Sequence, residues 1–137
     1  MSDDVPLEQV EPVITLHIGF LLMPEYTLST FSNAVGILRM ANRLSGRELY
    51  RWSTYTLTGE PVISSSALEI RPDGPLHSAA ELNILVVCGG YNIKQHCTKL
   101  LSERLREFAK RKIPLGALCT GTYALAYAGL LDGYRCT

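Results

Sequence analysis

The chain has 137 residues, of which 47% are hydrophobic and 19% are charged. This length supports one hydrophobic core and is too short for two, so we expect a single domain. Thirteen basic and thirteen acidic side chains leave no net charge, which argues against direct binding of nucleic acid or of an anionic membrane.

The chain begins with a polar, acidic stretch that lacks the basic and apolar blocks of a signal peptide. We expect residues 1–12 to form a flexible or disordered tail and residues 13–137 to form the folded domain. No apolar run reaches the roughly 18 residues that a membrane span requires. These features favour a cytoplasmic protein with no membrane partner.

The first half of the domain is predicted to form a strand, a helix and a second strand. Residues 13–22 are almost continuously apolar and β-branched, which is typical of a strand covered on both faces. Pro24 ends this strand because proline cannot donate to a ladder. A helix is predicted to begin near residues 27–29, which can cap it, and to end at Ser45-Gly46. Residues 51–57 alternate between apolar and polar, and predict the second strand.

The second half continues the alternation of strands and helices. Residues 62–73 are short, β-rich and bounded by turns, and predict a small hairpin or arm. A buried strand is predicted at residues 83–88, an amphipathic helix at 102–111, and a further buried strand at 112–118 that runs into a helix. This order favours an open α/β sandwich, in which ligands bind at the carboxyl ends of the strands.

Two special turns fall at those carboxyl ends. Cys119 joins a strand directly to a helix, so its side chain is held clear of both and points into the crevice above the sheet. The amides of Thr120 and the next residues can stabilise a thiolate or a bound anion. Gly89 and Gly90 follow the preceding buried strand and let the backbone turn sharply and approach a ligand. The alternative is that Cys119 is only a small apolar residue in a tight turn.

Several motifs together resemble the class I glutamine-amidotransferase-like superfamily, in its PfpI-type branch. Within that branch the chain is most similar to the amino-terminal sensing domains of GlxA-like regulators of the AraC type. The matching segments are residues 18–24, 38–44, 48–52, 88–90, 116–126 and 129–133. The resemblance covers residues 13–137. It implies a flavodoxin-like, open, mostly parallel sheet with helices on both faces, usually dimeric and joined to a carboxyl-terminal helix-turn-helix domain that binds DNA.

The resemblance also implies a set of ligand-binding residues. Cys119 matches the elbow position, Thr120 supplies the amide beside it, and Gly89, Gly90 and Tyr91 match the loop that faces the elbow. Tyr123 lies close enough to the elbow to line a pocket, although its spacing from Tyr127 is also typical of two core residues.

The chain departs from the enzymes of the superfamily at two places. Those enzymes place a glutamate from the first helix near the elbow cysteine, whereas Thr30 and Gly36 stand here where relatives often have acidic residues. The chain also stops at Thr137, where relatives continue into a strand that carries a histidine. We therefore expect a sheet that is incomplete at its C-terminal side. Without a positioned base, Cys119 would be a poor nucleophile.

The three histidines of the chain offer weak substitutes for that base. His17 lies inside the first strand and is expected in the core, and His77 is expected in a solvated loop. His96 follows the glycine turn and either reaches the crevice or lies in a surface loop. Since His96 and Cys97 are adjacent they cannot normally chelate one ion, and no C-x-x-C pair is present. We expect no metal and no cofactor.

The function predicted from these features is ligand sensing without catalysis. Residues 48–52 resemble family members linked to the catabolism of arginine, choline, betaine or carnitine, which implies a small ligand of the amino acid or methylated amine class. We expect a homodimer that contacts DNA only through a C-terminal domain outside this chain. The alternatives are a cysteine-dependent hydrolase, amidase or glyoxalase-like enzyme that uses Cys119, and a redox sensor that oxidises the same thiol.

Overall fold

The computed structural model describes Pro12 and residues 14–136. The predicted tail, residues 1–12, lies outside the described residues apart from Pro12, so both it and the boundary at residue 13 stay predictions. No helix within residues 14–136 is long and apolar enough to cross a membrane.

The centre of the fold is a sheet of five parallel strands with the order β5-β2-β1-β6-β7. These strands are β1 (Leu16–Leu22), β2 (Tyr50–Thr56), β5 (Gly74–Pro75), β6 (Ile84–Cys88) and β7 (Leu115–Leu118). The nearly continuous apolar run forms β1, which pairs with β2 on one side and β6 on the other, as predicted for a strand covered on both faces.

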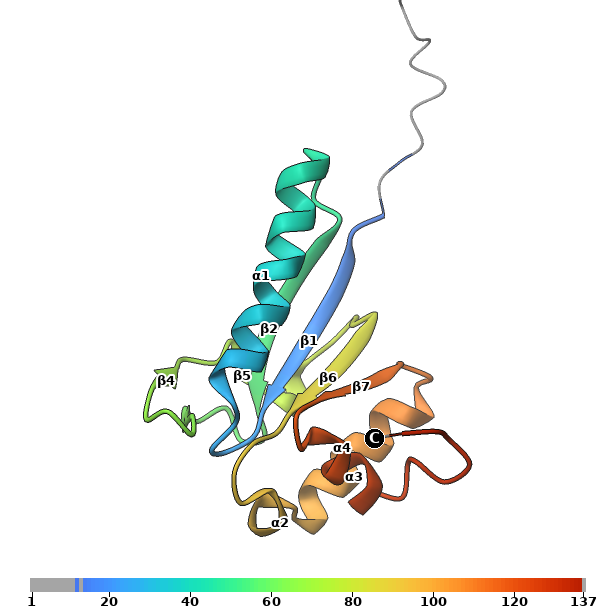
Figure 1. Cartoon of the computed structure of the whole chain (residues 1–137). Helices are drawn as coiled ribbons and strands as arrows, with labels where there is room; N and C mark the ends of the chain where they lie inside the picture. Colours follow the sequence, from blue (N-terminus) through green and yellow to red (C-terminus); the bar gives the residue numbers. More distant parts are fainter. Residues whose placement is uncertain (1–11, 13, 137) are drawn as a thin grey trace, which may run out of the picture.

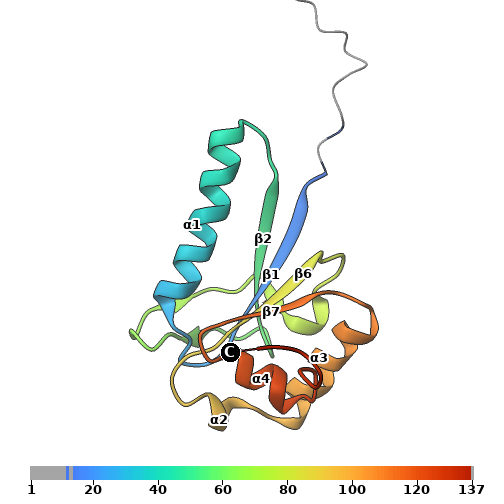
Figure 2. The same cartoon turned by 45° about the vertical axis from the view of Figure 1, so that its right-hand side comes forward.

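Helices cover both faces of this sheet, which confirms the flavodoxin-like prediction. Helix α1 (Leu28–Ser45) packs on one face, and α3 (Lys99–Lys110) and α4 (Gly121–Tyr127) pack on the other (Figures 1 and 2). Alternate residues of β1 serve the two cores. Phe20 packs against Phe31 of α1 with ring centroids 5.3 Å apart, whereas Leu21 belongs to the cluster that includes Leu105 of α3.

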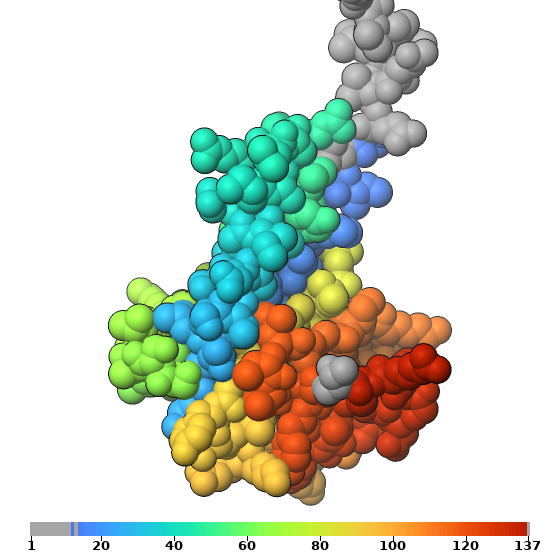
Figure 3. Space-filling view, viewed as in Figure 1, coloured from blue at the N-terminus to red at the C-terminus, as the bar shows by residue number. Residues whose placement is uncertain are grey.

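The sequence signals at the ends of α1 are borne out at the backbone level. Thr27 is the N-cap residue, and Gly46 ends the helix in the left-handed conformation, with φ 67° and its N–H donated to the carbonyl of Arg43. The second half of α1 stands clear of α3 and α4 (Figure 3). Ile37 and Leu44 on that half are 70% and 81% exposed.

The predicted hairpin is present and packs against the loop between β1 and α1. It consists of β3 (Val62–Ile63) and β4 (Glu69–Ile70), paired antiparallel. The amide of Glu25 donates to the carbonyl of Ile63 at 2.8 Å. Three short elements were not predicted: β5, the 3₁₀ turn η2 (Leu76–Ser78) and α2 (Ile93–His96).

Candidate functional site

The direction of the strand order changes next to β1, because the chain leaves β1 toward β2 and returns on its other side as β6. At such a point the loops that leave neighbouring strands separate and form a crevice at the carboxyl edge. The loops after β1, β6 and β7 meet at this edge. The amide of Met23 donates to the carbonyl of Cys88, that of Thr27 to Gly89, and that of Gly89 to Leu118, at 3.0–3.2 Å.

Cys119 occupies the predicted turn between β7 and α4. Its φ is +53°, which is a conformation that costs a residue with a side chain roughly 1–3 kcal/mol. The side chain is exposed. Its thiol accepts a hydrogen bond from the hydroxyl of Thr27 at 3.4 Å. Among the described residues, the amides of Cys119 and Thr120 have no hydrogen-bond partner, so both remain available to a bound group.

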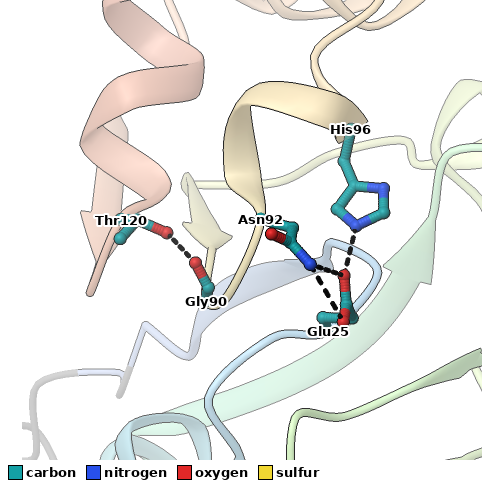
Figure 4. Close-up of polar contacts among 5 residues, drawn as sticks. All are labelled: Glu25, Gly90, Asn92, His96 and Thr120. Carbon is teal, nitrogen blue, oxygen red and sulfur yellow. Dashed lines mark hydrogen bonds and ion pairs between the residues drawn. The ribbon is translucent and has the colours of Figure 1, made fainter.

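Two threonines connect the loops of this edge through their hydroxyl groups. Thr27 and Thr120 are the N-cap residues of α1 and α4, yet within the described part of the chain neither side chain caps its helix. Thr27 binds Cys119 instead, and Thr120 donates to the carbonyl of Gly90 at 2.7 Å (Figure 4). Thr27 does occupy the predicted N-cap position of α1. Its side chain does not make the expected capping hydrogen bond, which is worth about 1 kcal/mol in other helices.

Gly89 and Gly90 allow the close approach that we predicted, and the partner in the structure is the protein's own backbone. A Cβ on Gly89 would lie 2.3 Å from the amide nitrogen of Gly121 and 2.7 Å from the hydroxyl of Thr120. A Cβ on Gly90 would lie 2.1 Å from the carbonyl oxygen of Glu25. The amide of Gly89 is occupied inside the fold, so the glycines shape the edge of the sheet by packing.

The two tyrosines near the elbow are both at the surface. Tyr91 is 68% exposed and Tyr123 is 38% exposed. The core interpretation of Tyr123 and Tyr127 is wrong, because Tyr127 is 49% exposed as well. The Lys94 ammonium of α2 lies 5.8 Å from the ring centroid of Tyr123, so the face of this ring already meets a cation.

A second polar cluster, Glu25-Asn92-His96, lies beside the elbow. The carboxylate of Glu25 binds Nε2 of His96 at 2.9 Å and accepts from the amide of Asn92 at 3.2 Å (Figure 4). These hydrogen bonds, that of His96 first, lower the pKa of the Glu25 carboxyl below its ordinary value. Asn92 itself sits at φ 55°, in the left-handed region, where it begins α2.

This cluster corrects the sequence interpretation of His96. The surface-loop alternative is wrong, because His96 lies in α2 with a side chain that is 22% exposed and bound to Glu25. Sequence reasoning looked for a carboxylate inside the first helix and missed Glu25, which stands just before it. The available signal was that Glu25 and His96 each follow a central strand. The exposed position expected for His77 is confirmed. His17 is hydrogen-bonded to Ser53 at 2.8 Å, but it is only half-buried and lies outside both core clusters, so the core position expected for it is wrong.

Two cavities adjoin the carboxyl edge and the outer strand. The smaller has a volume of about 240 Å³ and lies at the ends of β1 and β2, under α2. Its lining consists of Leu22, Met23, Pro24, Thr56, Leu57, Thr58, Val62, Gln95, His96 and Thr98. The larger, of about 840 Å³, follows β7, α4 and residues 129–136. In the described part of the chain, neither is lined by the six predicted binding residues Gly89, Gly90, Tyr91, Cys119, Thr120 and Tyr123.

Binding of a metal ion requires a cluster of suitable side chains. Residues 14–136 contain no group of three or more histidine, cysteine, aspartate or glutamate side chains that could hold an ion.

The sequence that forms this sheet and its carboxyl edge matches a known family over most of its length. Residues 21–137 match the model of the DJ-1/PfpI family. The chain belongs to the DJ-1/PfpI family. This confirms the resemblance to PfpI-type domains.

The curated relatives of this DJ-1/PfpI chain include transcriptional regulators. The HTH-type transcriptional regulator GbdR of Pseudomonas aeruginosa is 48% identical over 120 residues, which are 88% of this chain and 33% of that protein. The regulator CdhR of the same species is 37% identical, over 86% of this chain and 35% of its own length. GlxA of Rhizobium meliloti is 35% identical, over 84% and 36%. The chain therefore spans about a third of the length of these relatives.

Solved structures agree with this assignment. An AraC family transcriptional regulator from Pseudomonas putida superposes with a TM-score of 0.76 and 28% identity, covering 88% of this chain and 65% of that one. The DJ-1 superfamily protein Atu0886 from Agrobacterium tumefaciens superposes with a TM-score of 0.68 and 21% identity, covering 86% and 61%, and shows the common fold.

Proposed function

We propose that this DJ-1/PfpI domain is the metabolite-sensing part of an HTH-type transcriptional regulator. The observation that carries the proposal is the 48% identity to GbdR across 88% of the chain. DNA binding is assigned to a separate domain of the whole protein, since the chain has no net charge and spans about a third of the relatives.

The proposed domain binds its ligand without turning it over. A cysteine nucleophile needs an adjacent general base or another source of activation. Among the described residues, the side chain that hydrogen-bonds the Cys119 thiol is the hydroxyl of Thr27, which has no basic character near neutral pH. The carboxylate of Glu25 is already engaged by His96 and Asn92. This arrangement suits recognition better than acyl transfer.

The proposed ligand is a small metabolite of the amino acid or methylated amine class, bound at the carboxyl edge of the sheet. The elbow residues Cys119, Thr120 and Tyr123 are proposed to line one side of the site, and Gly89, Gly90 and Tyr91 the facing loop. The free amides of Cys119 and Thr120 support this placement because they offer two donors on the same turn.

We further propose that the domain is cytoplasmic and self-associates. Ile37 and Leu44 form part of an exposed apolar stripe on α1, which a second copy could cover. Light scattering at increasing protein concentration tests this: a constant monomer mass would contradict it.

The central experiment is a thermal-shift and calorimetric screen of amino acids and methylated amines against the protein. A ligand should raise the melting temperature and bind in a saturable manner, with no chemical change detected by NMR after prolonged incubation. Tyr123→Ala and Cys119→Ser should weaken the binding. A well-folded protein that stays silent across the screen contradicts the sensing function.

A cysteine-dependent enzyme of the hydrolase, amidase or glyoxalase-like kind is the second candidate. The exposed Cys119 at a strained φ favours it, because strain of this kind is concentrated at functional sites. Turnover of an amide, an ester or an α-oxoaldehyde that disappears in Cys119→Ala would establish this activity.

A further inference from the structure

The charged side chains are distributed unevenly along the sequence. None of the thirteen basic side chains falls within residues 1–11, which hold four of the thirteen acidic ones: Asp3, Asp4, Glu8 and Glu11. Residues 12–137 therefore carry thirteen basic side chains against nine acidic ones. The neutral chain thus consists of a short acidic segment, residues 1–11, and a domain with a net positive charge. Opposite charges attract each other over about 8 Å at physiological salt, so the segment is drawn to basic surfaces within its reach.

One such surface is the second half of α1 and the turn that follows it. Arg39, Arg43 and Arg47 are exposed there, and within residues 14–136 none of the three makes an ion pair. Glu48 is the one acidic residue near them in the sequence. This surface therefore carries a net positive charge that the described part of the chain does not neutralise.

The same half of α1 exposes apolar side chains. Ile37, Met40 and Leu44 are 70%, 41% and 81% exposed, and their spacing of three and four residues places them on one side of the helix. Together with Arg39 and Arg43 they form what we call the outer face of α1. The acidic segment also carries apolar residues between its charges: Val5, Leu7 and Val10. The segment and the outer face therefore match in charge and in apolar character.

The chain enters the fold beside this face. The hydroxyl of Thr15 donates to the carbonyl of Glu48 at 2.7 Å, and the amide of Leu16 donates to the carbonyl of Leu49 at 2.9 Å. The start of β1 and the end of α1 thus lie at the same end of the molecule (Figure 2). An extended chain of eleven residues spans about 36 Å, whereas the outer face is about 11 Å long. A short tether also keeps the segment at an effective concentration on the order of 1 mM, so weak contacts are enough for docking.

We propose that the acidic segment docks on the outer face of α1, with its carboxylates against Arg39 and Arg43 and its apolar side chains over Ile37 and Leu44. Contacts of this kind can interchange, so the docking requires no single fixed conformation of the segment. A second copy would have to displace the segment from the same face. The proposal thus deepens the self-association proposed above, on which its consequence rests: the segment limits formation of the dimer.

The experiment is cross-linking of the full chain with a water-soluble carbodiimide. This reagent joins a carboxylate to an amine as an amide and takes up the released water as a urea. Arg43→Lys keeps the positive charge of the outer face and supplies the amine. Peptide mass spectrometry of the isolated monomer should find this amine joined to a carboxylate of residues 1–11. The yield should fall several-fold at about 1 M salt, where charges are screened beyond about 3 Å.

Arg71→Lys is the matched control for the cross-link. Arg71 is also exposed, and it directly follows the hairpin, which packs against the loop at the opposite end of α1. An amine at position 71 should join the acidic segment at least fivefold less often than one at position 43. Both substitutions exchange one exposed cation for another, so neither should disturb the fold.

A second measurement follows self-association by sedimentation equilibrium. One variant neutralises the four acidic side chains of the segment: Asp3→Asn, Asp4→Asn, Glu8→Gln and Glu11→Gln. Its matched control neutralises four exposed carboxylates beside the hairpin and on α3: Glu60→Gln, Glu69→Gln, Glu103→Gln and Glu107→Gln. The first variant should lower the dissociation constant of the dimer at least threefold, because the segment no longer competes for the outer face. The control changes the net charge equally and should leave the constant unchanged.

Each result has a definite meaning. Equal cross-linking at positions 43 and 71, or none at position 43, overturns the docking. Cross-links at position 43 that occur only in the dimer assign the outer face to a second copy and overturn it as well. A dimer that forms but is no tighter in the neutralised variant overturns the competition. If every variant stays monomeric while the monomer is cross-linked at position 43, the docking is supported and the self-association proposed above is wrong.

Discussion

Replacing Gly89 by alanine should destabilise the protein strongly, because this residue packs backbone against backbone. The added Cβ would lie 2.3 Å from the amide nitrogen of Gly121, 2.6 Å from the carbonyl carbon of Thr120 and 2.7 Å from the Thr120 hydroxyl. Contacts this short do not occur at real Cβ atoms, and two of the three neighbours are backbone atoms that cannot rotate away. The loop after β6 or the start of α4 must therefore move.

The size of the effect follows from known costs of overpacking. Extra methyl groups in tightly packed regions cost about 1–3 kcal/mol, and backbone contacts place Gly89→Ala at about 3 kcal/mol. With an unfolding entropy of about 2.1 cal/mol/K per residue, a chain of 137 residues changes its melting temperature by about 3–4 °C per kcal/mol. We expect a decrease of about 10 °C.

The same substitution at Gly36 supplies the control. Gly36 lies inside α1, and a Cβ there would meet nothing within 4 Å. Gly36→Ala should therefore stabilise the protein by about 0.8–1 kcal/mol through helix propensity. Both variants are compared with the parent by calorimetry and by urea denaturation. If Gly89→Ala melts within 2–3 °C of the parent, the close packing that we infer at the elbow is wrong.

Three further outcomes are expected. Asn42→Ala should cost about 2–3 kcal/mol in urea denaturation, because its side chain makes three hydrogen bonds of 2.7–2.9 Å to Leu49 and Tyr50, each worth about 1 kcal/mol. Glu25→Gln should flatten the acid limb of the stability curve: the pKa of Glu25 is lowered in the fold, so its contribution is complete above the ordinary value of 4.5 and is lost as the pH falls through the lower folded value. An equal acid limb in parent and variant would contradict this. Iodoacetamide at pH 8 should modify Cys119 and spare the buried Cys88, whose pKa burial raises to about 12; peptide mass spectrometry reads out both, and prompt labelling of Cys88 in folded protein would refute it.

The fold could be predicted from the sequence because its signals are local. The apolar run of β1 and the strand–turn–helix around Cys119 depend on residues that are neighbours in the chain. The central place of β1 follows from its apolar character on both faces, and the parallel pairing follows from the alternation of strands and helices. The order of the five strands was not predicted. Gly46 ends α1 through its own backbone conformation.

The pairing of Glu25 with His96 could not be predicted in the same way. The two residues are 71 positions apart, and their contact depends on α2, a four-residue helix too short to have its own periodicity. The hydroxyl of Thr27 was misassigned for a related reason. An N-cap threonine normally bonds locally, and only the approach of the β7–α4 turn offers it a thiol instead.

Glu25 makes contacts on two sides of its loop. Its carbonyl oxygen accepts a hydrogen bond from the amide of Tyr91, and its carboxylate binds His96. Thermodynamic linkage then makes the two sides reciprocal. If a group bound beside His96 changes the equilibrium affinity of a group at the elbow by some factor, the group at the elbow changes the affinity of the first group by that same factor. The loop of residues 25–27 touches both sides, so a change in the chemical state of Cys119 and a change beside His96 would each alter the free energy of the other.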